Sequence, residues 1–557
     1  MKRDLKQLAD TAYDLLVVGG GITGAFLAWD AALRGLTVAL VDKGDFGHAT
    51  SAASSKIIHS GIRYLQQLGF GRFRESLQEQ KIFLRMAPHL VHPVPFLIPT
   101  YGHGLRGKGL LVLAMACYRL LETNQEKPGD PGKRLPPHRF LGRREVLALE
   151  PDLPSQGLTG GLVYHECQMH SSERMTLGVI RSAVQAGARA ANYVEVTDFL
   201  RRRDEIVGVR ARDVLSGDTL EIQARMVVNA SGPWVRHLLA RLWGEAQTAR
   251  MSFAKGVHLL TRPLTRGHAL ALLIPQRSEA LVGRGGRHLF IIPWRGHALI
   301  GTTNVPFPGE PDAVRVTEGD VRDFVREINA AYPAAALRGE DVRFAYAGLY
   351  PLEGRRLKPG VYQGGGRYRI HDHERAEGIR GLISVVAVKY TTARSLAQKA
   401  VDLVFRKWGR TPPPCLTART PIHGGDIPCF HEFLSAATRK PAYGLSPEAA
   451  QELVLNHGTA YEDVLRHVAE DPRWARRLSE ARPTIAAEVL HGVREEMAQT
   501  LSDVVFRRTG LGTLGHPGEA CLQACAEIMA GELGWRAERT QRELAAVRRA
   551  LRPAGEA

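Results

Sequence analysis

The sequence predicts an α/β protein in which a Rossmann-like nucleotide-binding domain is joined to a mixed-sheet substrate domain and a helical C-terminal domain. The first observation is the stretch Tyr13 to Asp42, which runs as apolar segment, glycine turn, helical apolar repeat and second apolar segment. The second is a mixture of strand and helix patterns up to the Pro/Gly-rich linker Gly409 to Pro428. The third is the helical pattern that follows this linker. Alternating strands and helices of this kind indicate an α/β fold.

The glycine turn has the spacing G-x-G-x-x-G at Gly19, Gly21 and Gly24. Gly19 permits a tight turn, Gly21 lets the backbone approach a pyrophosphate, and Gly24 lets the helix pack closely on the sheet. The start of the helix offers N–H groups to phosphates. Asp42 ends the second strand, where a carboxylate can accept hydrogen bonds from a ribose. The alternative is a glycine-rich turn in an ordinary parallel sheet, but the flanking elements favour a dinucleotide site.

A second nucleotide motif is not found in the sequence. The cluster Gly364 to Gly366 lacks a preceding strand and a following helix. The chain is therefore predicted to bind one nucleotide, which favours tightly held FAD over a relay between NAD and a flavin.

Further elements follow from local patterns. Glu195 to Val196, Ile206 to Val209 and Arg225 to Asn229 are predicted to be strands, and a hairpin is predicted around Arg295-Gly296. In the C-terminal part an apolar residue recurs every fourth position, which predicts one amphipathic helix. The residues of this stripe are Ile485, Val489, Val493, Met497 and Leu501.

Composition narrows the class of protein. The 557 residues are 44% hydrophobic with a formal charge of +17, which is typical of a globular protein. The longest apolar run, Leu110 to Cys117, falls short of the roughly 20 residues that a membrane span needs. The N-terminus lacks a signal-peptide core, and the six cysteines lack metal-site spacing, so a cytoplasmic protein with reduced thiols and no metal site is predicted.

The positive charge has several interpretations. Basic residues are spread along the chain and do not alternate with aromatic residues, so no nucleic-acid partner is predicted. Contact with anionic lipid head groups is the functional interpretation, and an arginine-rich background is the alternative.

Ser54 to Leu65, SSKIIHSGIRYL, is the segment with the clearest catalytic potential. Read as a helix, it places Lys56, His59 and Arg63 on one face. Cations can bind an anionic substrate, and a neutral histidine can accept the proton when an alcohol loses hydride. The alternative is a solvated cationic helix face.

Long segments of the chain resemble the FAD-dependent glycerol-3-phosphate dehydrogenases, within the wider family of D-amino-acid-oxidase-like flavoproteins. The resemblance covers nearly the whole chain and rests on the glycine turn with VDKGDFGHATSAASSKIIHSGIRYLQ, then NASGPW, KGVHL, FIIPW, IGTTN, GLISVVAVKYTTAR and the C-terminal EVLHGVREEMAQTLSDVVFRRTGLG. It implies oxidation of sn-glycerol 3-phosphate to dihydroxyacetone phosphate by hydride transfer to FAD, with electrons passed to a membrane quinone.

The resemblance also implies roles for individual residues. The implied cofactor-binding residues are Gly19, Gly21, Gly24, Asp42, Thr50, Ser51, Ser54, Ser55, Ser231, Gly232, Lys389, Tyr390 and Thr391. The implied catalytic residues are His59, Arg63 and Lys389. The implied substrate-binding residues are Arg63, Tyr64, Tyr350, Arg369 and Lys389, with Arg367 as the other register for Arg369.

Three departures from the family pattern bear on the substrate. The family's A-G-L-R-P reads AGLYP here, so Tyr350 replaces an arginine and a charged bidentate contact is lost. Asn304 replaces the aspartate of G-T-T-D, and Ala387-Val388-Lys389 replaces G-G-K. A flavoenzyme of the same fold acting on another small hydroxy acid or an amine is therefore the alternative, and a non-catalytic basic scaffold that binds lipid or nucleic acid is a further one.

The predicted FAD-binding domain comprises residues 1–85, 160–250 and 380–410. The predicted substrate domain comprises residues 86–159 and 251–379, and the helical C-terminal domain residues 411–557. Expected partners are a phosphorylated small molecule, a quinone or other electron acceptor, and an anionic membrane surface, with a homodimer left open. The expected location is the cytoplasm, including the inner face of the cytoplasmic membrane.

Overall fold

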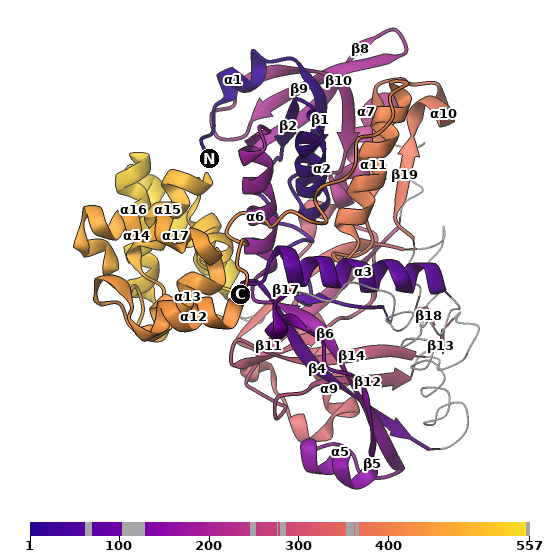
Figure 1. Ribbon diagram of the computed structural model, residues 1–557, viewed down its shortest axis with the longest axis vertical. Helices are drawn as coiled ribbons and strands as arrows, with labels where there is room; N and C mark the ends of the chain where they lie inside the picture. Colours follow the sequence, from indigo (N-terminus) through magenta and orange to yellow (C-terminus); the bar gives the residue numbers. More distant parts are fainter. Residues whose placement is uncertain are drawn as a thin grey trace.

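The computed structural model describes residues 1–61, 69–102, 129–244, 252–275, 277–278, 286–352, 361–362 and 367–552. Two large sheets form the body of the molecule, and a group of C-terminal helices packs against one side of it (Figure 1). The predicted mixed α/β class with a helical C-terminal region is confirmed. The predicted Leu110 to Cys117 segment and the Gly364 to Gly366 cluster lie outside the described residues.

The first sheet is built around β1 (Tyr13–Val18), which pairs in parallel with strands on both sides. Its central path runs in the order β19-β20-β10-β1-β2-β7, and β8 and β9 extend it beside β10. The other strands are β2 (Val38–Val41), β7 (Arg189–Ala191), β8 (Val194–Arg202), β9 (Glu205–Asp213), β10 (Thr219–Asn229), β19 (Arg369–Asp372) and β20 (Leu382–Val386). The strands predicted near residues 195, 206 and 225 are confirmed as parts of β8, β9 and β10.

Helices cover this sheet. The predicted helix after the glycine turn is α2 (Ile22–Leu33), and eleven of its twelve residues are buried because α6 (Ser172–Gln185) and α11 (Ala393–Lys407) pack beside it. A helix that is apolar all round belongs in the interior of a protein. Within the described residues before the linker, the other α-helices are α1 (Leu5–Ala9), α3 (Phe70–Met86), α5 (Arg143–Leu149), α7 (Val235–Trp243), α9 (Glu318–Ala331) and α10 (His373–Glu377).

The second sheet lies in the lower half of Figure 1 and follows the order β16-β11-β15-β14-β12-β4-β6-β3, with β17 beside β11 and β5 beside β6. The predicted hairpin around Arg295-Gly296 is confirmed, because β14 and β15 pair in antiparallel across it. The strands are β3 (Ile57–Ile58), β4 (Val91–Tyr101), β5 (Arg139–Gly142), β6 (Leu158–Met169), β11 (Phe253–Thr261), β12 (Ala269–Pro275), β14 (Gly286–Trp294), β15 (His297–Gly301), β16 (Val305–Phe307) and β17 (Phe344–Pro351). A short separate pair joins β13 (Arg277–Ser278) to β18 (Val361–Tyr362).

The C-terminal region is helical as predicted. Its helices are α12 (Phe430–Arg439), α13 (Pro447–His457), α14 (Tyr461–Glu470), α15 (Ala486–Glu496), α16 (Glu519–Leu533) and α17 (Ala537–Leu551), with a π-helical turn at Asp503–Arg508. The prediction of one helix reaching Leu501 is wrong: α15 ends at Glu496, and Met497 takes the left-handed φ of +57°. Met497 and Leu501 are nevertheless buried. The four-residue spacing therefore predicts correctly that these two residues are buried, but not that the helix continues through them.

Two expectations from composition can be compared with the described residues. None of the helices in the described ranges combines the length and the apolar character that crossing a bilayer requires. The five described cysteines are unpaired thiols, and Cys521 and Cys525 are buried in the C-terminal core. The predicted domain boundaries stay a prediction.

Candidate functional site

The glycine turn connects β1 to α2 and has no room for side chains. Gly19 has a φ of +109°, and a Cβ atom there would lie 2.6 Å from the carbonyl oxygen of Ala230. A Cβ atom at Gly24 would lie 1.8 Å from the carbonyl oxygen of Gly19, so α2 can pack this closely only with glycine. Gly21 caps α2 without a side-chain hydrogen bond and faces a cavity. The start of α2 is therefore arranged as an anion-binding helix terminus.

Asp42 fixes this turn from the end of β2. Its carboxylate accepts hydrogen bonds from the N–H groups of Gly20, at 2.6 Å, and Gly44, at 2.8 Å. Burial raises the pKa of Asp42, and the neighbouring His48 and the two backbone donors oppose that rise. The carboxylate thus holds the glycine turn against β2 while it lines the cavity.

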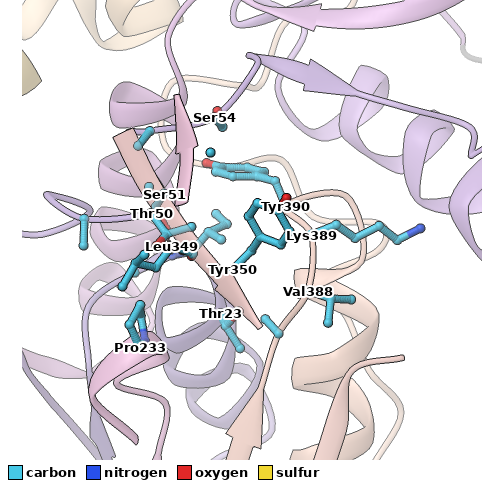
Figure 2. Close-up of a pocket in the computed structure, with 18 of the residues that line it drawn as sticks. Thr23, Thr50, Ser51, Ser54, Pro233, Leu349, Tyr350, Val388, Lys389 and Tyr390 are labelled. Atoms are coloured by element: carbon cyan, nitrogen blue, oxygen red, sulfur yellow. Dashed lines mark hydrogen bonds between the residues drawn. The ribbon is translucent and has the colours of Figure 1, made fainter. Parts of the chain in front are cut away.

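One continuous cavity of about 700 Å³ extends from Asp42 and the glycine turn into the space between the two sheets. Figure 2 shows Thr50, Ser51 and Leu349 on one side and Val388 and Lys389 on the other. The predicted cofactor-binding residues that line it are Gly19, Gly21, Asp42, Thr50, Ser51, Ser54, Ser55, Ser231, Gly232, Lys389 and Tyr390. Its volume lies within the range of ligand pockets, roughly 300–1,000 Å³.

The hydroxyl-rich segment from Thr50 to Ser55 joins both sheets. Ser51 Oγ accepts from the N–H of Ile22 at 3.0 Å, and Thr50 Oγ1 donates to the carbonyl of Leu349 at 2.9 Å. Ser55 Oγ lies 2.9 Å from His258 Nε2. These bonds place the segment along the cavity wall between the nucleotide turn and β17.

The helical interpretation of the segment after Ser54 is wrong within the described residues. Ile57 and Ile58 form β3, which pairs in antiparallel with β6, and Lys56 has a left-handed φ of +57°. Side chains alternate along a strand, so Ile57 and His59 line the cavity while Ile58 joins the core. Lys56 is buried away from the cavity, with its Nζ 2.6 Å from Glu173 Oε1.

His59 stands inside the cavity next to a buried carboxylate. Burial, and then the charge of Lys389, lower the pKa of His59 to about 3, so its imidazole is neutral near pH 7. Glu166 of β6 accepts from the N–H of Ser60 at 2.6 Å and from Gln80 Nε2 at 2.7 Å. Burial raises the pKa of Glu166 to about 7 against these donors. Perturbed groups of this kind in a pocket mark a candidate catalytic centre.

Lys389, Tyr390 and Thr391 follow β20. The side chain of Lys389 is extended (Figure 2), and its Nζ donates to Ser76 Oγ of α3 at 2.6 Å. Burial lowers the pKa of Lys389 to about 8. Tyr390 Oη donates to the carbonyl of Ser172 at 2.9 Å. Thr391 does not line the cavity, but its Oγ1 accepts from the N–H of His59 at 3.2 Å and so positions that residue.

The predicted substrate-binding residues divide into three groups. Tyr350 lines the cavity, and its Oη donates to Asn304 Oδ1, so two of the residues that depart from the family pattern are bonded to each other. Arg369 and Arg367 have exposed side chains and do not line the cavity. Arg63 and Tyr64 lie outside the described residues.

The C-terminal region reaches the nucleotide turn through a buried ion pair. Arg508 of the π-helical turn binds both carboxylate oxygens of Asp45, at 2.7 and 2.8 Å, and Arg507 adds a bond of 2.5 Å. The side chain of Asp45 is fully buried, and although burial opposes its ionisation, the two arginines hold its pKa well below the usual range. Asp45 comes three residues after Asp42, so the C-terminal region stabilises the loop that lines the cavity.

Two family models match consecutive parts of the chain. Residues 14–382 match the FAD dependent oxidoreductase family, and residues 415–540 match the C-terminal domain of alpha-glycerophosphate oxidase. A glycerol-3-phosphate dehydrogenase of Synechocystis is 34% identical over 554 residues, which cover 97% of each chain.

The chain belongs to the FAD-dependent glycerol-3-phosphate dehydrogenase family.

Other members of this family are similar over most of the chain. A glycerol-3-phosphate dehydrogenase of Mycobacterium leprae is 32% identical over 96% of this chain and 87% of its own. The crystal structure of the glycerol-3-phosphate dehydrogenase from Bacillus halodurans complexed with FAD has a TM-score of 0.75 and 27% identity, covering 99% of this chain and 97% of that one. The FAD cofactor and the Rossmann-like fold of the family apply to this chain.

Three cavity residues of this family member were not singled out from the sequence: Glu166, His258 and His288. Glu166 is the one acidic residue of β6 and follows His165, and a single acid in a strand is little signal of a site. His258 lies in the KGVHL motif, and burial lowers its pKa to about 3. Each enters the site through strand pairing in the second sheet, and local patterns do not report which strands become neighbours.

Proposed function

We propose that this protein oxidises sn-glycerol 3-phosphate to dihydroxyacetone phosphate with bound FAD and passes the electrons to a quinone. The observation that supports this most is the single cavity that joins a dinucleotide-binding turn to an interior containing His59, Glu166 and Lys389. Membership of the glycerol-3-phosphate dehydrogenase family also supports this activity.

The residues present fit FAD. Gly19 and Gly21 leave backbone exposed to the cavity at the start of α2, where a pyrophosphate would bind. Asp42 lines the ribose end, and the Thr50 to Ser55 segment lines the path toward the interior. When bound, FAD supplies a two-electron acceptor for the hydride that leaves C2 of the substrate.

His59 is proposed as the group that accepts the hydroxyl proton as C2–O becomes a carbonyl. A base needs an unprotonated nitrogen, and the neutral imidazole provides it. The low pKa makes His59 a weak base while burial and the positive charge of Lys389 disfavour its imidazolium form. A substrate phosphate adds negative charge nearby, which favours the imidazolium and raises the basicity of His59.

Lys389 is proposed as a fixed cation for the substrate phosphate or the reduced flavin. With a pKa of about 8, its ammonium group is mostly charged at pH 7. The bond to Ser76 Oγ fixes its position, and a fixed charge stabilises a transition state without reorganisation. Arg63 and Tyr64 are proposed to complete the phosphate site. The positive charge of that site would then come from Arg63 and from Lys389.

Replacing Glu166 by glutamine is expected to remove the dependence of kcat/KM on pH between pH 6 and 7. In the native enzyme Glu166 ionises as pH rises through about 7, and its negative charge then offsets Lys389 and raises the basicity of His59. We expect kcat/KM to rise about fivefold between pH 6 and 7, as a single deprotonation near 7 requires. Glu166→Gln mimics the protonated acid and should flatten that rise.

Steady-state kinetics over this pH range test the assignment. The exposed Glu221→Gln variant is the control and should keep the native profile, since the Glu221 side chain pairs with Arg210 at the surface and does not line the cavity. An unchanged rise in Glu166→Gln would assign the titration to another group.

Transfer of electrons to a quinone at an anionic membrane surface is proposed from the formal charge of +17. Each lysine or arginine close to an anionic membrane surface contributes about 1 kcal/mol to binding of the protein to that membrane. A membrane-bound acceptor would then be within reach of the enzyme.

Anaerobic mixing of the purified yellow protein with sn-glycerol 3-phosphate tests the reaction. We expect the flavin absorbance to bleach and dihydroxyacetone phosphate to form in equal amount. A second candidate, oxidation of another small hydroxy acid or an amine, is favoured by Tyr350 and its bond to Asn304, since neither side chain carries a charge. Bleaching by such a compound and not by glycerol 3-phosphate would decide for this candidate.

A further inference from the structure

Two histidines and a glutamate converge at the edge of the first sheet, outside the cavity. His371 is the third residue of β19, and His373 and Glu377 begin and end the short helix α10. His371 Nε2 lies 2.8 Å from Glu377 Oε1, and His373 Nδ1 lies 3.0 Å from Glu377 Oε2. One nitrogen or oxygen atom from each residue lies within 4.8 Å of the others. None of these three described side chains lines the cavity.

This donor set matches the coordination chemistry of zinc. Zn²⁺ takes imidazole nitrogens at about 2.0–2.1 Å and carboxylate oxygens at about 2.0–2.2 Å in tetrahedral sites. Those bond lengths place neighbouring ligand atoms about 3.3 Å apart. The two histidine–glutamate distances of 2.8 and 3.0 Å, which involve different oxygens of Glu377, are within a few tenths of an ångström of this spacing. The complete set of ligand atoms lies within 4.8 Å, so a small adjustment of the side chains is needed to admit the ion.

His373 is already oriented as a ligand. Its Nε2 lies 2.8 Å from Ser384 Oγ of β20, and Trp243 stacks on its ring at a centroid distance of 5.2 Å. In the tautomer with the proton on Nδ1, His373 donates to Glu377 and accepts from Ser384 Oγ. Metal binding at Nδ1 moves the proton to Nε2, which then donates to Ser384, and a hydroxyl can take either role.

The surroundings leave the site open to an ion. Lys407 Nζ binds the neighbouring carboxylates of Asp372, at 2.6 Å, and Glu374, at 2.5 Å, so Glu377 is the carboxylate of this helix that faces the histidines. The side chains of His371 and Glu377 are 47% and 34% exposed, which provides an entry path and room for a water ligand.

We propose that His371, His373 and Glu377 form a binding site for a divalent transition metal ion, with Zn²⁺ as the best fit and water as the fourth ligand. The ion would connect β19 to α10. Through the bond between His373 and Ser384 it would also stabilise β20 next to Val385 and Val386, which line the cavity. This site is independent of the oxidation reaction proposed above.

A second group, His457, His491 and Glu496, has similar spacing but unsuitable charge. Arg174 and Arg181 bind the Glu496 carboxylate at 2.6 and 2.8 Å, so its negative charge is already matched by two cations. An added Zn²⁺ would be repelled by both arginines, and this group is better explained as a buried ion-pair network.

Titration of the chelator-treated, FAD-loaded full-length protein with Zn²⁺ tests the proposal, with a chromophoric chelator as competitor. We expect one equivalent to bind, and His371→Ala and Glu377→Gln each to weaken binding by about tenfold or more. His516→Ala is the matched control, because His516 also pairs with a glutamate, Glu519, on the surface, and this variant should bind as the native protein does.

A second readout reports the position of the ion. Cu²⁺ bound at this site should quench the fluorescence of Trp243, and the quenched fraction should fall in Trp243→Phe. The absence of stoichiometric Zn²⁺ binding, or equal binding by the native, His371→Ala and Glu377→Gln proteins, would overturn the proposal. Loss of binding in His491→Asn, with retention in His371→Ala, would move the site to the buried group.

Discussion

Replacing His59 by asparagine is expected to lower kcat by about 10²- to 10⁴-fold, the contribution of a positioned general base. Asparagine keeps a polar side chain in the cavity but cannot accept the hydroxyl proton. The residue is held there through β3 and through the bond from its N–H to Thr391 Oγ1, so the backbone around the FAD site should be unchanged. Stopped-flow reduction of the flavin by sn-glycerol 3-phosphate measures the chemical step directly.

The control for this prediction is the FAD content of the variant, which should equal that of the native protein. His516→Asn, an exposed histidine of the C-terminal region, should retain the native reduction rate. Full-speed flavin reduction in His59→Asn would remove His59 from the role of base and favour Glu166, whose pKa of about 7 suits proton transfer near neutral pH.

Replacing Arg508 by alanine is expected to destabilise the folded protein by about 3 kcal/mol, at the lower end of the cost of breaking a buried ion pair, because Asp45 then keeps only Arg507 as a charged partner. Arg508 is 1% exposed and binds both oxygens of Asp45 as well as the carbonyl of Glu496. Because the Asp45 loop lines the cavity wall, we also expect FAD to dissociate more readily. Urea denaturation followed by circular dichroism, and flavin fluorescence after dilution, measure the two effects.

The matched control is Arg494→Ala, which removes an arginine–glutamate pair with Glu532 at the surface. Its side chain is 41% exposed, so we expect a loss of about 1 kcal/mol or less. The double variant Asp45→Asn with Arg508→Met should recover much of the stability, because both charges of the pair are removed together and Arg507 keeps its ion pair with Asp503. Equal effects of Arg508→Ala and Arg494→Ala would contradict the importance of the buried pair.

The parts of the fold that could be predicted from the sequence are those fixed by local pattern. The sequence predicts the helix α2 after the glycine turn, because its apolar repeat and the turn before it are both local features. The β14–β15 hairpin was predicted from its turn residues. The segment after Ser54 was not, because its strand conformation depends on pairing with β6, more than 100 residues later.

The candidate site divides in the same way. Gly19, Gly21 and Asp42 belong to one βαβ unit and can be found from their spacing together with the strand and helix patterns that flank them. Glu166 and His258 reach the cavity from strands of the second sheet, and the short pattern around each residue is that of an ordinary buried strand. Their roles depend on burial and on neighbours that only the assembled sheet brings together.

The pairing of Asp45 with Arg508 also has a consequence for biosynthesis. The two residues are 463 positions apart, so at about 5–20 residues per second the arginine is made roughly 20–90 s after the aspartate. During that interval the newly made amino-terminal half carries a carboxylate that has no counter-ion. Capture of the flavin by a nascent chain should therefore reach full strength only when translation is nearly finished.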